Sequence, residues 1–229
     1  MHYDSLKSSI LYQDDLIIVI NKPASMPVHS GTGGGENLEQ YLGELCFGLP
    51  DKPIPAHRLD RDTSGCLILG RNKEGLRRIG KIFMARRITK TYLAVVHGSF
   101  DKIEGRIDIN LRKQSPLKHR WWMEAHPEGQ PSVTDYRVIN QKENLAAVEF
   151  YPRTGRTHQI RVHCKAIGHP IVGDKIYGFE QDPENLTMHL HALAITIPLY
   201  HNQSPIEISA PPPAHMLGKL QECGYCEHA

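Results

Sequence analysis

The stretch HRLDRDTSG, residues 57–65, carries the most specific chemical pattern in the chain. It places two carboxylates among two arginines and a histidine and ends in a Thr-Ser-Gly turn. If the stretch is extended, successive side chains alternate between faces, so Arg58, Asp60 and Asp62 project to the same side. Charged groups are costly to bury unless they are paired. The stretch therefore indicates either an active site or a surface strand with ion pairs and a turn.

Hydrophobic spacing on both sides of this stretch predicts a mixture of hairpins and helices. Before it, we expect strands at 9–12 and 16–21, joined through Asp14-Asp15, and a helix over 37–45. After it, we expect a strand at 66–69 and a helix that Asn72 caps and that runs to about residue 86. Later predicted elements are strands at 91–96, 133–139, 145–151, 188–197 and 206–208, a helix over 157–167 ended by Gly168, and a short helix in the tail. This order favours an α+β fold over a doubly wound parallel sheet.

Length and composition are those of an ordinary globular protein. The 229 residues fit one domain, or one domain built as two lobes around a cleft, with 40% apolar and 23% charged residues. The longest apolar run, 16–20, suits one strand, so no membrane span is expected. The five cysteines are scattered, and the chain does not open with a charged segment followed by an apolar one. We therefore expect reduced thiols and a cytoplasmic protein.

The charge distribution is more informative than the net charge of +2. Residues 71–90 contain eight arginines and lysines against one acid, Glu74, a local net charge of +7. A second basic cluster at 112–120 runs into Trp121-Trp122. Clustered cations neutralise phosphates and adjacent aromatic rings stack on bases, which suggests a nucleic-acid partner. The alternative is a solvated helix face and a surface loop.

Residues 57–65 resemble the signature of the RluA-type RNA pseudouridine synthases, which reads His-Arg-Leu-Asp, two variable residues and Thr-Ser-Gly. Further stretches are similar to that family in the same order along the chain: a hairpin and lysine-proline loop at 14–29, KTYLA at 90–94, TGRTHQIRVH at 154–163, GHPIVGD at 168–174 and LHA at 190–192. The resemblance implies a pseudouridine synthase fold, with a mixed, mainly antiparallel sheet, flanking helices and a central active-site cleft. It predicts an N-terminal extension at 1–8, a catalytic domain at 9–213 and a C-terminal tail at 214–229.

The resemblance also implies roles for individual side chains. Asp60 becomes the catalytic carboxylate and Arg161 its partner, while Arg58 enters the RNA stack where the target nucleotide leaves. Tyr92 becomes the aromatic that packs on the flipped uracil. A carboxylate in a closed site needs such a guanidinium, because desolvation raises its pKa and the cation lowers it again. Further expected RNA contacts are His57, Arg61, Thr63, Lys90, Arg156 and His158.

The implied activity is the isomerisation of a specific uridine to pseudouridine in a stem-loop of ribosomal or transfer RNA, without a cofactor or metal. We expect a monomer. The small RNA-binding S4 domain of many relatives has no room before residue 9, so recognition is expected from the catalytic domain alone.

Two other functions fit parts of the pattern. Asp60 and Asp62, two residues apart in a strand, would lie about 7 Å apart, which suits the carboxylate pair of an N-glycoside hydrolase. An RNA-binding or folding factor without catalysis would explain the basic clusters alone. Cys223 and Cys226, with His228 nearby, lack the second ligand pair that a zinc site usually needs, and a redox dithiol should open a helix after a strand. His189 and His191 alternate onto one strand face and could in principle bind metal, but the resemblance places His191 in a structural stretch.

Overall fold

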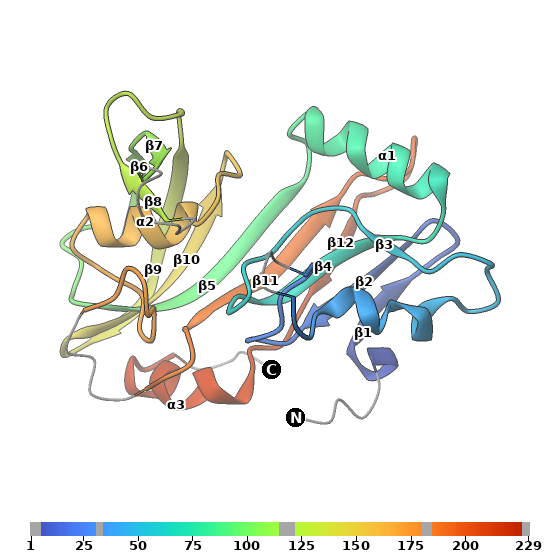
Figure 1. Ribbon diagram of the computed structural model, residues 1–229. Coiled ribbons are helices and arrows are strands. Elements are labelled where there is room, and N and C mark those ends of the chain that lie inside the picture. The colour runs from blue at the N-terminus through green and yellow to red at the C-terminus, as the bar shows by residue number, and fades with distance from the viewer. Residues whose placement is uncertain (1–5, 31–33, 115–121, 180–184, 226–229) are drawn as a thin grey trace. The chain divides into compact units, whose positions relative to one another are not determined.

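The computed structural model describes residues 6–30, 34–114, 122–179 and 185–225. It divides into two compact units, Met1–Lys90 with Ala192–Pro212 and Thr91–His191 with Pro213–Ala229. The chain passes from one unit to the other within strand β5 (Thr89–His97) and within strand β11 (Leu190–Ile197), both labelled in Figure 1. Each unit is therefore assembled from segments that are distant in sequence. No helix among the described residues is long and apolar enough to cross a membrane.

The first unit is built on antiparallel strand pairs. Strand β2 pairs with β1 on one side and with β4 on the other. Strand β4 also pairs with β3 and lies next to β11, and β11 pairs with β12. The bounds are β1 Ile10–Gln13, β2 Ile17–Lys22, β3 Ile54–Pro55, β4 Ser64–Gly70 and β12 Ile206–Ser209, after a short 3-10 helix at Leu6–Ser9. Gly65 has a φ of +105°, and a side chain there would overlap the backbone of Ala192 in β11. The glycine of the Thr-Ser-Gly turn is therefore required by the close approach of β4 to β11.

Two local signals in the first unit are confirmed. Asp14 closes the β1–β2 turn, because its carboxylate accepts hydrogen bonds from the backbone N–H groups of Leu16 and Ile17, both at 2.8 Å. The Asn72 side chain accepts from the backbone N–H of Gly75 (2.9 Å) and so caps helix α1, Lys73–Met84. The inner face of α1 packs on β4 and contributes to a buried cluster: Ile17, Val19, Cys66, Ile68, Ile79, Ile82, Ile88, Ile195, Ile197, Leu199, Ile208 and Ala210.

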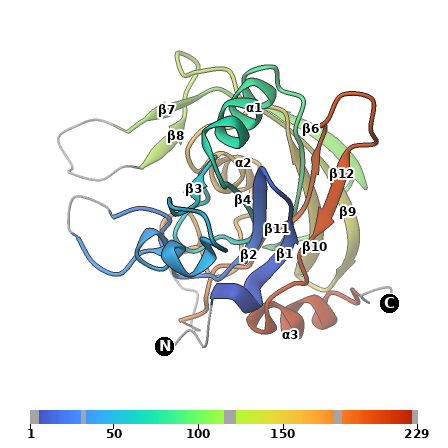
Figure 2. The same ribbon diagram turned by 90° about the vertical axis from the view of Figure 1, so that its right-hand side faces the viewer.

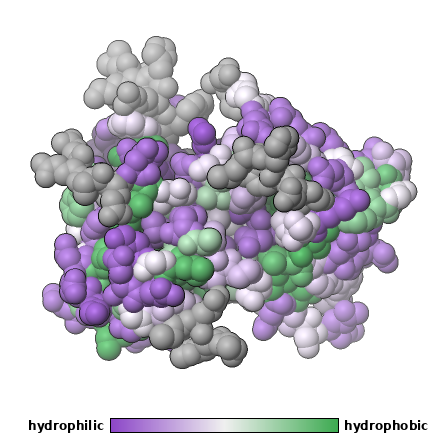
Figure 3. All heavy atoms as spheres, turned by 90° about the horizontal axis from the view of Figure 1, so that it is seen from below, coloured by the Kyte–Doolittle hydropathy of each residue, from purple (hydrophilic) through white to green (hydrophobic). Residues whose placement is uncertain are grey.

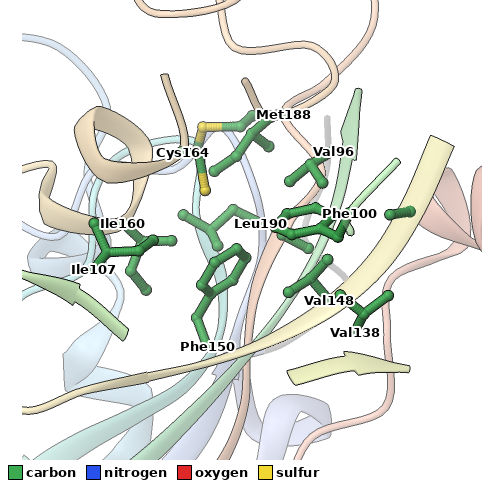
Figure 4. Close-up of a cluster of buried hydrophobic side chains, with 13 residues drawn as sticks. Val96, Phe100, Ile107, Val138, Val148, Phe150, Ile160, Cys164, Met188 and Leu190 are labelled. Atoms are coloured by element: carbon green, nitrogen blue, oxygen red, sulfur yellow. The ribbon is translucent and has the colours of Figure 1, made fainter. Parts of the chain in front are cut away.

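The second unit holds a sheet in which β5, β10, β9 and β6 follow one another with antiparallel pairing. Figure 2 shows the hairpin of β7 and β8 as a separate ribbon from these strands. The bounds are β6 Glu104–Asp108, β7 Leu111–Lys113, β8 Met123–Ala125, β9 Val133–Lys142, β10 Leu145–Pro152, α2 Gln159–Ala166 and α3 Ala214–Glu222. Side chains from the sheet and α2 form the core in Figure 4, where Phe150 and Leu190 lie among Val148, Ile160 and Cys164.

The α+β fold and most predicted elements are confirmed, with three corrections. The helix expected over 37–45 is two 3-10 turns, Leu38–Gln40 and Leu42–Leu45, which still bury the three leucines. Helix α2 begins at Gln159 rather than 157, because His158 adopts a left-handed φ of +53°. Strands β3, β6, β7 and β8 were missed, and β3 is only two residues long. β6 buries only Ile107 and so shows no apolar alternation, and β7 and β8 are three residues each.

Large apolar side chains on the surface are scattered. Those that remain exposed include Phe47, Ile54, Met84, Ile103, Phe179 and Leu217. On the face drawn in Figure 3, hydrophobic residues form separate patches among hydrophilic ones. Isolated exposed hydrophobic residues are normal in folded proteins and do not by themselves indicate an interface.

A histidine in the second unit, His189, is buried and has a lowered pKa. His189 is 1% exposed, its Nδ1 lies 2.8 Å from the carbonyl oxygen of Thr187, and its Nε2 has no hydrogen-bond partner among the described residues. Burial, together with the neighbouring His215, lowers the pKa of His189 to about 4. The imidazole is therefore neutral in the folded chain at neutral pH.

We expect the stability of the chain to fall as the pH drops from about 6.5 to about 4. In this window the unfolded chain binds a proton at His189 that the folded chain does not, so acid favours unfolding, by at most about 1.4 kcal/mol per pH unit from this group. Urea unfolding at pH 7, 6 and 5 measures the slope. His189→Leu should flatten it, while the same substitution at exposed His201 should leave it unchanged. Identical slopes for the two variants would contradict this assignment.

Candidate active site

Asp60 lies in a turn rather than in a strand. The backbone N–H of Thr63 donates to the carbonyl oxygen of Asp60 at 3.2 Å, and the chain becomes extended only from Ser64. The prediction that Arg58, Asp60 and Asp62 project to the same face of a strand is therefore wrong beyond Asp60. The distance of about 7 Å between Asp60 and Asp62 assumed for a hydrolase also rested on a strand. Asp60 and Asp62 are half-buried and Arg58 is exposed. The turn thus presents Arg58 to solvent and keeps both carboxylates partly shielded.

Lys22 holds this turn from inside the first unit. Its side chain is fully buried, and its Nζ donates to the carbonyl oxygens of Pro23 (2.7 Å), Met26 (2.8 Å) and Arg61 (3.1 Å). Burial lowers the pKa of Lys22 to about 7, although the negative charges of Asp62 and Asp60 act in the opposite direction. The buried amino group of Lys22 therefore fixes the backbone next to Asp60 and interacts electrostatically with both carboxylates.

Replacing Lys22 by methionine should destabilise the chain by about 3 kcal/mol, because three carbonyl groups, one of them fully buried, lose a donor that the thioether cannot replace. Urea unfolding followed by circular dichroism measures this loss. Lys52→Met is the control, since Lys52 is exposed and donates to one carbonyl oxygen, that of Glu39. Its expected effect is within about 0.5 kcal/mol. Equal effects at the two positions would show that the Lys22 contacts contribute nothing.

His57 supports the same segment from the other side. Its Nε2 accepts a hydrogen bond from the backbone N–H of Ile68 in β4 (3.0 Å), and its ring contacts that of Phe83 in α1 with centroids 5.2 Å apart. Burial, together with the charge of Lys90, lowers the pKa of His57 to about 4. Burial also lowers the pKa of Lys90. His57 is therefore a neutral acceptor that attaches the segment to β4 and α1.

Two further side chains of the segment differ in exposure. Thr63 is buried, and its hydroxyl has no hydrogen-bond partner within the described part of the chain. Arg61 is exposed, and its Nε lies 3.4 Å from the carbonyl oxygen of Ser25. The Arg61 backbone is thus held by Lys22 while its side chain reaches solvent.

Arg161, in the second unit, is buried and forms an ion pair with Asp174. This partner was not predicted from the sequence. The Nε and Nη2 of Arg161 donate to the two carboxylate oxygens of Asp174 at 2.7 and 2.8 Å, and the two side chains are 5% and 0% exposed. Asp174 also accepts from the backbone N–H groups of Ile176 and Tyr177. Burial raises the pKa of Asp174, but the Arg161 guanidinium and the two N–H groups outweigh burial and hold the pKa below its ordinary value. Arg161 is thus fixed in orientation rather than free on the helix surface.

Tyr177 extends this network. The Arg161 guanidinium lies over its ring at 5.0 Å, and its hydroxyl lies 2.8 Å from Nδ1 of His158 and accepts from the backbone N–H of Met123 at 2.8 Å. His158, a predicted RNA contact, is therefore engaged with Tyr177 through one nitrogen. Arg156 is half-buried, and its backbone N–H donates to the Gln159 side chain at the start of α2.

Tyr92 lies in β5, opposite Phe150 of β10, and is half-buried against the core of the second unit. It thus has both a packed face and an accessible part. A signal for Lys22 existed in the sequence, since a lysine that ends the apolar run 16–21 is almost never fully buried unless it is paired.

The structure also describes some of the residues that were considered for metal binding, redox use or base stacking. No group of three or more His, Cys, Asp or Glu side chains in the described ranges could hold a metal ion. Cys223 is fully buried, and burial raises the pKa of its thiol to about 11, which disfavours the thiolate. Trp122 is half-buried. Cys226, His228, Trp121 and the cations at 118–120 lie outside the described residues.

Comparison with known proteins decides the family. A family profile described as RNA pseudouridylate synthase matches residues 16–166, well over half of the chain. The chain belongs to the RNA pseudouridine synthases. An uncharacterized RNA pseudouridine synthase of Zymomonas mobilis is 41% identical over 91% of this chain and 95% of its own length. The ribosomal large subunit pseudouridine synthase D of Haemophilus ducreyi is 34% identical over 93% of this chain and 70% of its own length.

Solved structures agree with the sequence relatives. Human RNA pseudouridylate synthase domain containing 1 superposes with a TM-score of 0.79 at 30% identity, over 97% of this chain and 90% of the human one. Human RNA pseudouridylate synthase domain containing 4 gives a TM-score of 0.80 at 25% identity, over 96% and 94% of the two chains. The resemblance stated from the sequence, the pseudouridine synthase fold and the isomerase activity are therefore confirmed.

Proposed function

We propose that this RNA pseudouridine synthase isomerises a uridine of ribosomal RNA, with Asp60 as its catalytic carboxylate. The observation that carries the role of Asp60 is its setting: a half-buried carboxylate in a turn whose backbone is held by the buried cation of Lys22. The choice of ribosomal RNA is supported by a relative named for the ribosomal large subunit. Action on ribosomal RNA also supports a cytoplasmic location. A monomer is proposed because one chain contains all the proposed groups.

The reaction moves the uracil from its N1 to its C5 attachment. The bond between C1′ and N1 breaks, a bond between C1′ and C5 forms, and the hydrogen on C5 is released while N1 gains one. Neither reacting atom is reachable inside a stacked helix, so the nucleotide must be extruded, which costs a few kcal/mol. Exposed Arg58 is placed on the segment next to Asp60, where its flat guanidinium can fill the vacancy. The accessible part of the Tyr92 ring then offers a stacking surface for the base.

Arg161 is the proposed partner of Asp60 in the reacting complex. Asp174 holds the Arg161 guanidinium in a fixed orientation through Nε and Nη2. We propose that the charge of this oriented guanidinium acts on Asp60. Because an arginine remains charged, this pairing keeps a desolvated Asp60 ionised, as a nucleophile or a base at the sugar requires. No cofactor is needed for these steps.

The remaining proposed RNA contacts come from both units. In the first unit they are Arg61, Thr63, Lys90 and His57, and in the second unit Arg156 and His158. Arg61 and Arg156 suit phosphates, and the buried hydroxyl of Thr63 suits a polar group of the flipped nucleotide. His57 is engaged with β4 through Nε2, so it contributes through the position of the segment.

Release of tritium from RNA labelled at uridine C5 tests the activity, and mapping of pseudouridines in total RNA with and without the protein identifies the target. The proposal predicts one or a few sites in ribosomal RNA. Sites found only in transfer RNA would refute the ribosomal assignment while keeping the chemistry. Appearance of free uracil would indicate glycoside hydrolysis, and absence of tritium release from both RNA classes would indicate a binding factor.

A further inference from the structure

The three α-helices in the described residues end in the same hydrogen-bond motif. In each, the residue after the C-cap has a left-handed φ, and its N–H and the next N–H both bond back to the last turn. Helix α2 places Gly168 there, with φ +85°, and α3 places Gly224, with φ +77°. Helix α1 places Arg86 there, with φ +54°, and Arg87 N–H then donates to the Ile82 carbonyl at 3.1 Å.

An arginine at this position is unfavourable for the backbone. Glycine adopts a left-handed φ without a steric penalty, whereas a side chain brings Cβ close to the following carbonyl oxygen. A cation near a helix C-terminus does interact favourably with the helix dipole. Lys81 in the last turn and Arg87 after it already provide such charges. The conformational penalty at Arg86 therefore points to a use of its side chain outside the fold.

Arg86 belongs to a group of exposed cations. Lys81, Arg86 and Arg87 are exposed, and no carboxylate among the described residues forms an ion pair with any of them. The single acid of this region, Glu74, is occupied by Arg77 and Arg78. We call Lys81, Arg86 and Arg87 the α1 basic surface. Its three like charges repel each other unless an anion binds, so it is available to an anionic partner.

The end of α1 is attached to the catalytic segment within the first unit. Phe83, in the last turn of α1, contacts the ring of His57, three residues before Asp60. Lys90, four residues after Arg86, acts electrostatically on the same His57. The α1 basic surface therefore adjoins the segment that carries Asp60, through interactions of half-buried side chains.

We propose that the α1 basic surface docks the phosphodiester backbone of the RNA substrate beside the nucleotide that is modified. This rests on the proposed function and adds to it a binding surface outside the turn of Asp60. Cations on an exposed helix end contact phosphates rather than bases, so the surface contributes affinity and register without sequence preference. Each phosphate contact releases counterions and steepens the salt dependence of binding by roughly 0.7 to 0.9 in log K against log salt.

The test uses the full chain and a fluorescent stem-loop RNA that carries uridines in its loop. The variant Lys81→Gln/Arg86→Gln/Arg87→Gln should bind roughly 10-fold or more weakly at 0.1 M salt, and its slope of log K against log salt should be smaller by about 2. The control Lys52→Gln/Lys102→Gln/Lys142→Gln removes the same charge from exposed positions elsewhere. Its slope should equal that of the wild type. Equal slopes for the two triple variants would overturn the inference.

Arg86→Gly separates binding from structure. Glycine suits the left-handed position, so the melting temperature should be at or above that of the wild type, while RNA affinity should fall. Arg86→Lys, which keeps the charge, should restore most of the affinity. A Gly variant that melts lower and binds as well as the wild type would show that Arg86 has a structural role only. Binding needs no turnover, so wild-type protein that binds RNA but makes no pseudouridine would refute the proposed function and leave this surface standing.

Discussion

Asp60→Asn should abolish pseudouridine formation while leaving the chain folded and able to bind RNA. The substitution keeps the shape of the side chain and removes the negative charge that the reaction requires, so turnover should fall at least about 10⁴-fold, the scale seen when a central catalytic group is removed. Tritium release from C5-labelled RNA measures turnover, and the melting temperature and RNA affinity report folding and binding. Retained turnover would show that the role proposed for Asp60 is wrong.

Asp62→Asn is the matched control for this variant. Both carboxylates act on the pKa of Lys22, and Asp62 has the larger effect, so any indirect damage through Lys22 should be greater in the Asp62 variant. We expect Asp62→Asn to keep activity within about 10-fold of the wild type, as for a charge away from the reacting atoms. Equal loss in both variants, together with release of free uracil by the wild type, would instead support a hydrolase that uses the two carboxylates as a pair.

Asp174→Asn should be the most destabilising single change in the proposed site. It removes the buried negative charge that the Arg161 guanidinium holds in a fork, and breaking a buried pair in this way costs about 3–5 kcal/mol. Urea unfolding should show this loss. Turnover, measured at a temperature where the variant remains folded, should also fall, by about 100-fold, because the guanidinium loses the fork that orients it.

Asp135→Asn provides the comparison within the same unit. Asp135 also accepts from two arginines, Arg106 at 2.6 Å and Arg153 at 2.7 Å, but both arginine side chains are 62% exposed. Solvent-exposed pairs contribute little, so the expected loss is below about 1 kcal/mol and activity should not change. If Asp135→Asn destabilised the chain as much as Asp174→Asn, burial of the Arg161 pair would not be the cause.

Local features of the fold were predictable from sequence because their signals act over a few residues. Asp14 predicts the β1–β2 turn, Asn72 the start of α1 and Gly168 the end of α2, and each forms its contact within five residues. The 3-10 turns at 38–45 were predicted as a helix because both conformations bury leucines at similar spacing. For residues 38–45, burial of the leucines was thus predicted correctly while the type of helix was not.

The side chains that support the site were not predictable from spacing. Arg161 and Asp174 are 13 residues apart, with the end of α2 and a turn between them, and Lys22 finds an acceptor 39 residues away at Arg61. Such partners depend on how distant segments pack, which no local periodicity encodes. The turn at Asp60 was missed because the local pattern was misleading: alternating charged residues resemble an exposed strand.

The crossings within β5 and β11 have a consequence for synthesis. The core of the first unit needs Ile195, Ile197 and Ile208, which leave the ribosome about 100 residues after Lys90. Strand β11 begins about 120 residues after β4 ends, so at about 5–20 residues per second β4 waits roughly 6–24 seconds for the strand beside it. An enzyme related to modifiers of ribosomal RNA thus emerges with an incomplete sheet edge, and completes the unit that carries Asp60 only after Ile208 has been synthesised.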